Sequence, residues 1–152
     1  MLTTIPDNFV YFSFNLIDKD REKLIDIANE MAPKQMIEAT KFYIDHITLL
    51  HKNDSRANLI KFTMYELLNY IFENHIGETY KVKVTHIGFN QKAIAFKVEL
   101  PDGFPQFMFK TYHITIATFG NNKPVESNTI INWHKLYKPI IITTVLKKVI
   151  TT

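Results

Sequence analysis

The stretch YHITIATFG, residues 112–120, is an apolar run with a histidine and a threonine set two positions apart. The same tripeptide, His-Ile-Thr, occurs earlier in DHITLLH, residues 45–51. Both runs predict buried β-strands, and side chains two positions apart on a strand share one face. In each copy the histidine and the threonine are therefore predicted to project together, while the isoleucine between them packs on the opposite side. If the two strands are neighbours, two imidazoles and two hydroxyl groups meet in one cleft.

The residues that would meet are His46 and Thr48 from the first copy and His113 and Thr115 from the second. Imidazole titrates near neutral pH, so one histidine can accept a proton from a nucleophile while the other donates one to a leaving oxygen. The threonine hydroxyls can donate to the non-bridging oxygens of a phosphoryl group, where negative charge develops. The set predicts phosphodiester chemistry without a metal and a bell-shaped pH–rate profile. His51 is predicted on the face opposite His46, outside the cluster.

A purely structural origin of the two motifs is the alternative to this interpretation. With six histidines in 152 residues, two bare His-x-Thr matches are unsurprising. A histidine on any buried strand also needs hydrogen-bond partners. The shared isoleucine and the apolar residues that follow both copies favour a common task. Asp45 precedes His46 and is expected to face away from the cluster, as neighbouring residues on a strand do.

Composition indicates an ordinary globular chain rather than a disordered or membrane-spanning one. Hydrophobic residues make up 46% and charged residues 22% of the sequence, and there is no cysteine, which excludes disulfides and thiolate ligands. No apolar run approaches the roughly 18–20 residues that cross a bilayer, and no secretory signal is visible, so a cytoplasmic location is expected. The formal net charge of +3 is a mild argument for an anionic partner, because the basic residues are dispersed along the chain.

Periodicity and turn residues predict one α+β domain spanning residues 1–152, since no composition shift or flexible linker divides the chain. Alternating or β-branched runs mark strands, and apolar residues at helical spacing mark two helices. The expected elements are a strand at 9–15, a helix that Asp18 can cap and that runs up to Pro33, a strand at 44–51, a helix from Asn58 that stops at Gly77, strands at 80–85 and 92–100 around a turn at 88–91, a strand with the second motif, a polar loop at 120–128, a short helix or irregular piece around Trp133 and a strand at 139–150.

Two H-x-T-hydrophobic motifs half a domain apart resemble the signature of the 2H phosphoesterase superfamily. Here they are HITL at 46–49 and HITI at 113–116, separated by 67 positions (113 − 46). The resemblance covers nearly the whole chain and implies a bilobal α+β fold, with mostly antiparallel sheets lining a central cleft and helices packed outside. Within the superfamily the chain looks most like the phage anti-CBASS nucleases, which hydrolyse cyclic di- and trinucleotide immune signals of bacteria.

The resemblance implies a phosphodiesterase that cleaves 3′–5′ linkages of a cyclic oligonucleotide such as 3′,3′-cGAMP and so blocks CBASS defence in an infected bacterial cytoplasm. It implies no cofactor and no metal, with the cyclic oligonucleotide as partner and no membrane or obligatory protein partner. His46 and His113 would be the acid–base pair, and Thr48 and Thr115 would hold the phosphoryl oxygens. A neighbouring 2′-hydroxyl would attack phosphorus to form a 2′,3′-cyclic phosphate, which water then opens.

Two further residues are predicted to bind substrate. Tyr11 lies on the first predicted strand, whose counterpart lines the cleft in this superfamily, and could stack on a base; a core tyrosine is the alternative. Lys123 lies in the loop after the second motif strand, as do Ser127 and Asn128, and could reach phosphate; a solvated loop without a role is the alternative. Trp133 could cover the site, although core packing is the favoured interpretation.

Other functions fit the sequence less well but stay open. An RNA-processing 2H enzyme acting on 2′,3′-cyclic phosphate ends would use the same four residues. A non-catalytic nucleotide-binding module would need none of the acid–base chemistry. The chain has no G-x-x-x-x-G-K-[ST] or G-x-G-x-x-G phosphate loop and no H-E-x-x-H zinc motif.

Overall fold

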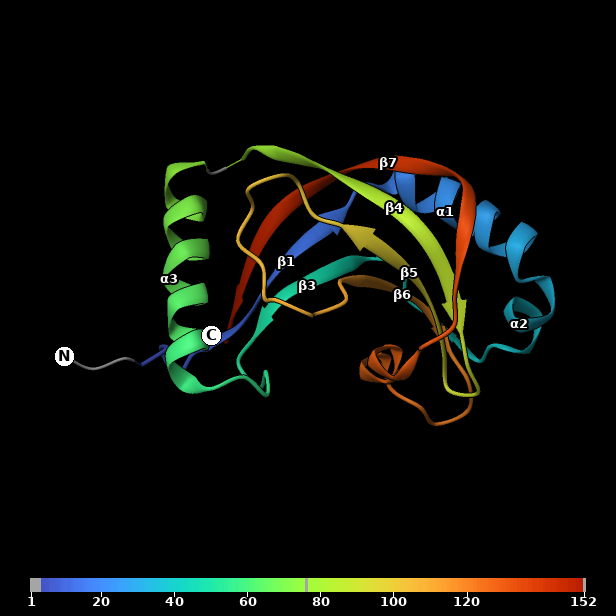
Figure 1. Ribbon diagram of the computed structural model, residues 1–152, viewed down its shortest axis with the longest axis horizontal. Coiled ribbons are helices and arrows are strands. Elements are labelled where there is room, and N and C mark those ends of the chain that lie inside the picture. The colour runs from blue at the N-terminus through green and yellow to red at the C-terminus, as the bar shows by residue number, and fades with distance from the viewer. Residues whose placement is uncertain (1–3, 76, 152) are drawn as a thin grey trace.

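The two His-Ile-Thr strands are neighbours in a closed antiparallel sheet (Figure 1). The computed structural model describes residues 4–75 and 77–151. In chain order the elements are β1 (Phe9–Leu16), α1 (Asp18–Met31), α2 (Pro33–Glu38), β2 (Lys41–Phe42), β3 (His46–His51), α3 (Asn58–Asn74), β4 (Thr79–Phe89), β5 (Ala93–Glu99), β6 (His113–Thr118), the 3₁₀ helix η1 (Pro124–Thr129) and β7 (Trp133–Ile150).

Six strands close into a barrel, and a seventh lies outside it. The order is β6-β3-β1-β7-β4-β5, β6 also pairs with β5, and the two-residue β2 pairs with the end of β6 at Ala117 and Thr118. The 18-residue β7 pairs with β1 along one part and with β4 along another, which carries the sheet around the bend. The expected bilobal α+β fold with sheets lining a central cleft is therefore wrong. Strand patterns do not reveal whether the two edges of a sheet meet, and here β6 joins them.

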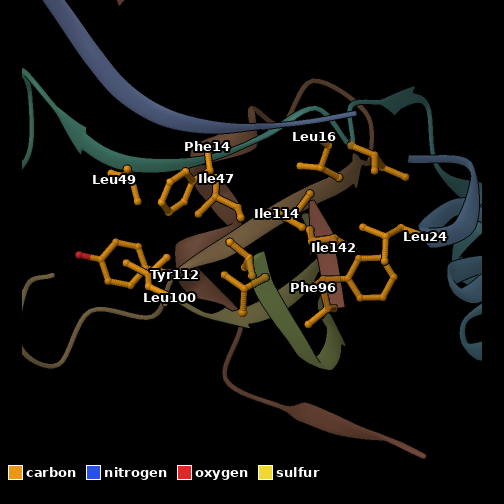
Figure 2. Packing of buried hydrophobic residues seen from close by; sticks show 14 of the residues in the cluster. Phe14, Leu16, Leu24, Ile47, Leu49, Phe96, Leu100, Tyr112, Ile114 and Ile142 are labelled. Atoms are coloured by element: carbon orange, nitrogen blue, oxygen red, sulfur yellow. The ribbon is translucent and has the colours of Figure 1, made fainter. Parts of the chain in front are cut away.

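The barrel interior fixes the register of the motif strands. Ile47 and Ile114 are cross-strand partners, and both are fully buried. They point into a cluster that includes Phe14, Phe96 and Ile142 (Figure 2). Burying a side chain of this size contributes roughly 1.5–3 kcal/mol, so a shift of register by one residue would expose several of them at once. The same packing turns the flanking histidines and threonines toward the outer face of the barrel.

The long helices pack on the same core as the strands, at opposite ends of the sheet (Figure 1). α3 stands at one end of the sheet and packs the ring of Tyr65 on Phe9, with a centroid distance of 5.0 Å, and on Phe12 at 5.6 Å (Figure 1). α1 and α2 lie toward the other end of the sheet. The predictions of α3 and α1 are confirmed, but Asp18 is not the cap of α1, because Ile17 occupies that position and no side chain caps the helix. The short helix α2 was not predicted.

Two further local predictions are wrong. The turn expected at 88–91 begins later, because Gly88 lies inside β4 and Asn90 closes the hairpin, its side-chain oxygen accepting the backbone N–H of Lys92 at 2.8 Å. Trp133 is not in an irregular piece but begins β7. None of the helices among the described residues combines the length and apolar character needed to cross a membrane.

Candidate active site

The floor of the site is a square of four side chains on β3 and β6. In an antiparallel pair whose partners are Ile47 and Ile114, His46 lies opposite Thr115 and Thr48 lies opposite His113. Directly opposed Cβ atoms are about 4.5–5.5 Å apart, and diagonal ones about 7–8 Å. The two imidazoles therefore occupy one diagonal of the square and the two hydroxyls the other. All four side chains are partly exposed and line one cavity of about 900 Å³.

Three segments raise walls around this floor. The chain between β3 and α3 and the loop between β5 and β6 form one wall, and η1 with the start of β7 forms the other. In Figure 1 the turn after β3 and the orange coil of η1 lie at opposite ends of the β3 and β6 strands. The cavity is thus open to substrate from the outside of the barrel, and its two walls differ in chemistry.

His46 is held on two sides. Its Nδ1 lies 3.0 Å from Asp45 Oδ1, and its ring stacks on Tyr11 with a centroid distance of 5.4 Å and an interplanar angle of 15°. The hydrogen bond to His46 lowers the pKa of Asp45 below its ordinary value despite partial burial. A carboxylate only accepts, so His46 Nδ1 carries the proton and Nε2 is left for substrate. The expectation that Asp45 faces away is wrong, because β3 begins at His46 and Ile44 turns the chain with a φ of 50°.

His113 is partly buried, like His46. Burial lowers its pKa from the ordinary value, and the positive charges of Lys110 and His46 lower it further, against a raising effect of the Thr111 carbonyl. Its Nδ1 lies 3.3 Å from that carbonyl oxygen, which can only accept. The neutral ring therefore carries its proton on Nδ1 and presents an unprotonated Nε2, which is the form of a general base.

Thr115 belongs to a small hydroxyl network with η1. Its Oγ1 lies 2.8 Å from Ser127 Oγ and donates to Pro124 O at 3.3 Å. Ser127 is buried, with 1% of its surface exposed. If Ser127 donates to Thr115, the single Thr115 proton can turn from its long contact with Pro124 O to a phosphoryl oxygen above it. Ser127 thus orients one of the two hydroxyls predicted to hold phosphate.

His51 lies in the same cavity, contrary to the expectation from strand alternation. The pairing of β1 with β3 shifts between Phe12 and Ser13, so that Leu49 is an extra residue in β3 and both Leu49 and Leu50 are buried. This bulge returns His51 to the face of His46, where its ring stacks on Tyr11 at 6.2 Å. Burial lowers the pKa of His51, and its Nδ1 accepts the backbone N–H of Asn53 at 3.0 Å.

The two predicted substrate-binding residues are placed differently. Tyr11 lines the cavity, with its ring parallel to both His46 and His51. Lys123 is exposed at the start of η1 and is not among the residues that line the cavity, whereas its neighbours Ser127 and Asn128 are. The structure therefore brings Tyr11 beside the square of His46, Thr48, His113 and Thr115 and leaves Lys123 outside the cavity.

One wall carries charges that were not singled out from the sequence, and we call it the cationic wall: His51, Asp54, Arg56 and Lys110. Lys110 Nζ lies 3.6 Å from Asp54 Oδ2, and the two side chains are only 17% and 11% exposed. Burial lowers the pKa of Lys110, and the Asp54 carboxylate raises it in part. Arg56 and Lys110 come from segments far apart in the sequence, so no local pattern could have grouped them.

The opposite wall is largely apolar, and we call it the apolar wall: Val125, Asn128, Ile130 and Trp133. Ile130 and Trp133 pack on Ala93 and Ala95 of β5. Beside them a Cβ on Gly88 would come within 2.6 Å of Trp133 Cε3. Three small residues thus let this wall lie directly against the barrel, and Trp133 both packs on this small hydrophobic cluster and lines the cavity. Among the described residues, no group of three or more His, Cys, Asp or Glu side chains could hold a metal ion.

Comparisons with known proteins give the family of the chain. The barrel and the paired His-x-Thr motifs fit the 2H phosphoesterase-like superfamily, which includes cyclic phosphodiesterases. The sequence model of the fungal tRNA ligase phosphodiesterase domain family matches residues 7–140, which contain both motifs, and the chain belongs to this family. Membership supports phosphoesterase activity in general. No finding supports the narrower resemblance to the phage anti-CBASS nucleases.

A solved structure shares the fold. The crystal structure of a fungal RNA kinase aligns with a TM-score of 0.70 and 14% sequence identity, over 96% of this chain and 46% of that one. The chain therefore spans about half the length of that protein, and the likeness concerns the fold alone. No curated protein matches the chain.

Proposed function

We propose that the chain is a ribonucleotide phosphodiesterase in which His113 is the first general base and His46 the first general acid. The observation that carries the proposal is the register of Ile47 with Ile114, which sets both histidines and both threonines around one point of the cavity floor. A phosphoryl group at that point meets an imidazole on either side, as in-line displacement requires. The threonine hydroxyls donate to its non-bridging oxygens.

The reaction follows from the protonation of the two rings. His113 Nε2 takes the proton of a 2′-hydroxyl as its oxygen bonds to phosphorus, and His46 Nε2 gives a proton to the leaving 5′ oxygen as that P–O bond breaks. The product is a 2′,3′-cyclic phosphate. In the second step the roles exchange: neutral His46 takes a proton from water as the water oxygen bonds to phosphorus, and protonated His113 gives its proton to the 2′ oxygen as the P–O2′ bond breaks, which leaves a 3′-phosphate.

We propose a small cyclic oligonucleotide with 3′–5′ linkages, such as 3′,3′-cGAMP, as the substrate. The size of the cavity, about 900 Å³, and the presence of walls on both sides of the floor support a ligand with a nucleoside on each side of the phosphorus. In an infected bacterium, removal of such a signal would block CBASS defence. Family membership supports a second candidate, an RNA end with a 2′,3′-cyclic phosphate, which would undergo only the second step.

The deciding experiment offers the purified protein 3′,3′-cGAMP and, separately, an oligoribonucleotide with a 2′,3′-cyclic phosphate end, both in EDTA. Turnover of the first substrate is expected, with a cyclic-phosphate intermediate. Turnover of the second substrate alone would replace the first candidate with the second. Dependence on a divalent ion would contradict the mechanism.

Variants test the residues. His46→Ala with His113→Ala is expected to bind the ligand without turning it over. His75→Ala is the matched control. His75 is exposed, its Nδ1 lies 3.1 Å from Glu78 Oε1, and it does not line the cavity. Product formation by the double variant at the rate of the unaltered protein would refute the assigned roles.

A further inference from the structure

The cationic wall holds two positive charges that the acid–base chemistry does not use. The guanidinium of Arg56 lies 5.4 Å from the centroid of the Phe107 ring, and the ammonium of Lys110 lies 5.5 Å from the same ring. Lys110 also lies 5.1 Å from the centroid of Tyr112. Both side chains line the cavity, so their charged ends are brought together beside the catalytic floor by packing on shared aromatic residues.

Asp54 organises this pair but does not neutralise it. Its Oδ1 accepts the backbone N–H of Arg56 at 2.9 Å, and its Oδ2 faces Lys110. Across the described part of the chain, no carboxylate lies within 4.0 Å of the Arg56 guanidinium. Two cations and one carboxylate leave a net charge of +1, to which His51 adds little, because burial lowers its pKa. A partly buried, uncompensated guanidinium at a cavity wall is a site that an anion completes.

The apolar wall carries no such charge. Val125, Ile130 and Trp133 offer hydrophobic surface, and Asn128 offers an amide. That composition suits a nucleobase, which stacks on aromatic surface and hydrogen-bonds through its edge. The two walls therefore give the ligand a direction: a base toward Trp133, and a further anionic group toward Arg56.

We propose that Arg56 and Lys110 form a second phosphate-binding subsite, so that the preferred substrate is a ribonucleotide with at least two phosphates, one nucleoside apart. The proposal rests on the proposed function only in placing the first phosphate between His46 and His113. It covers a cyclic dinucleotide and an RNA end alike, because in both the nucleoside whose 2′ and 3′ oxygens lie at the reacting phosphorus carries a second phosphate on its 5′ oxygen. Nucleoside 2′,3′-cyclic monophosphates, which lack the second phosphate, are poor substrates.

The test compares substrates with one and two phosphates. Adenosine 2′,3′-cyclic monophosphate has one phosphate, whereas 3′,3′-cGAMP and a diadenylate ending in a 2′,3′-cyclic phosphate have two. A hydrogen bond to a charged group contributes about 1.5–3 kcal/mol, which is roughly 10- to 100-fold in binding. Arg56→Gln is expected to lower kcat/KM for the two-phosphate substrates at least 10-fold more than for the one-phosphate substrate. Lys110→Gln is expected to act in the same direction.

Lys52→Gln is the matched control. Lys52 is exposed, follows His51 of the cationic wall in the sequence, and does not line this cavity, so the substitution removes one charge near the wall but outside the site. It should change both substrate types equally and by less than about 2-fold, as screening of surface charges predicts. Equal losses on both substrate types in Arg56→Gln would overturn the second subsite. Thermal unfolding of each variant separates such a result from a loss of folded protein.

Binding separates this inference from the proposed function. In the His46→Ala, His113→Ala background, the dissociation constant of 3′,3′-cGAMP should rise about 10-fold or more when Arg56→Gln is added. If the unaltered protein turns over none of the substrates while this Arg56-dependent binding persists, the catalytic proposal fails and the subsite stands. If turnover occurs but is indifferent to Arg56 and Lys110, the subsite fails and the catalytic proposal stands.

Discussion

Gly88→Ala is expected to displace the apolar wall of the cavity without touching a catalytic residue. A Cβ at this position would lie 2.6 Å from Trp133 Cε3, 2.8 Å from Ile130 Cγ2 and 2.9 Å from the backbone oxygen of Asn132. Carbon atoms in contact are about 3.5–4.0 Å apart, so the Trp133 ring has to move by roughly 1 Å. Because one of the three contacts is backbone, a change of side-chain rotamer alone cannot relieve it, and the segment from Ile130 to Trp133 shifts as a unit.

The expected magnitude follows from overpacking. Forcing an added methyl group into a packed site costs about 1–3 kcal/mol, and the reduced freedom of the unfolded chain offsets about 0.4–1 kcal/mol of it. The net loss in the free energy of unfolding is then about 0.5–2 kcal/mol, which lowers Tm by roughly 1–8 °C at this chain length. Base stacking contributes about 1–3 kcal/mol, so a displaced Trp133 should raise KM by about 5- to 100-fold.

Calorimetry and steady-state kinetics on 3′,3′-cGAMP measure the two effects. Gly77→Ala is the control: Gly77 has a φ of +84° and nothing within 4 Å of its Cβ position, so alanine there strains the backbone without moving a neighbour. This control should lower Tm while leaving KM unchanged. A Gly88→Ala protein with the Tm and KM of the unaltered protein would refute the reasoning that Gly88 seats Trp133 in the cavity.

Three further predictions concern the catalytic square. Asp45→Asn replaces the charged partner of His46 with a neutral one and should lower kcat by about 10-fold or more with little change in KM. Kinetics at saturating substrate measure this effect, and an unchanged kcat would show that Asp45 has no part in the mechanism. Ser127→Ala removes a hydrogen bond to Thr115 worth about 1–2 kcal/mol and should lower kcat by about 5- to 30-fold. If Ser127→Ala lowers kcat by the same factor in a protein that already carries Thr115→Ala, the two hydroxyls act independently and the prediction is wrong. Lys110→Gln removes a positive charge that lowers the pKa of His113, so the pKa of His113 should rise in this variant. Because the base loses activity when it is protonated, the acidic limb of the pH–rate profile should then move to higher pH. A limb that moves to lower pH would contradict the assignment of His113 as the base.

Strand alternation allowed the core of the site to be predicted from sequence, and it failed where the strand was irregular. His46 and Thr48 share a face because Ile47 between them is buried, a relation local to three residues. The same rule placed His51 on the wrong side, since the bulge at Leu49 inserts one residue and reverses the alternation beyond it. It placed Asp45 wrongly because the strand begins at His46 and not at residue 44, so that Asp45 lies outside it. A bulge depends on how a strand pairs with its neighbour, and the pairing of strands cannot be read from the pattern of a single strand.

The sequence alone determined which residues could do acid–base chemistry on phosphate. In each His-Ile-Thr copy the isoleucine packs on one face of the strand, and the histidine and the threonine share the other face. The sequence also determined the main helices and strands, through the spacing of apolar side chains. Only the tertiary structure decided that β6 lies between β3 and β5 and closes the barrel, which brings the two copies into register. The walls were decided in the same way: Arg56 meets Lys110 over Phe107, and Trp133 reaches the cavity over Gly88. Contacts between distant segments depend on the path of the whole chain and on small residues that let another segment pack closely. Neither of these produces a periodic pattern in the sequence.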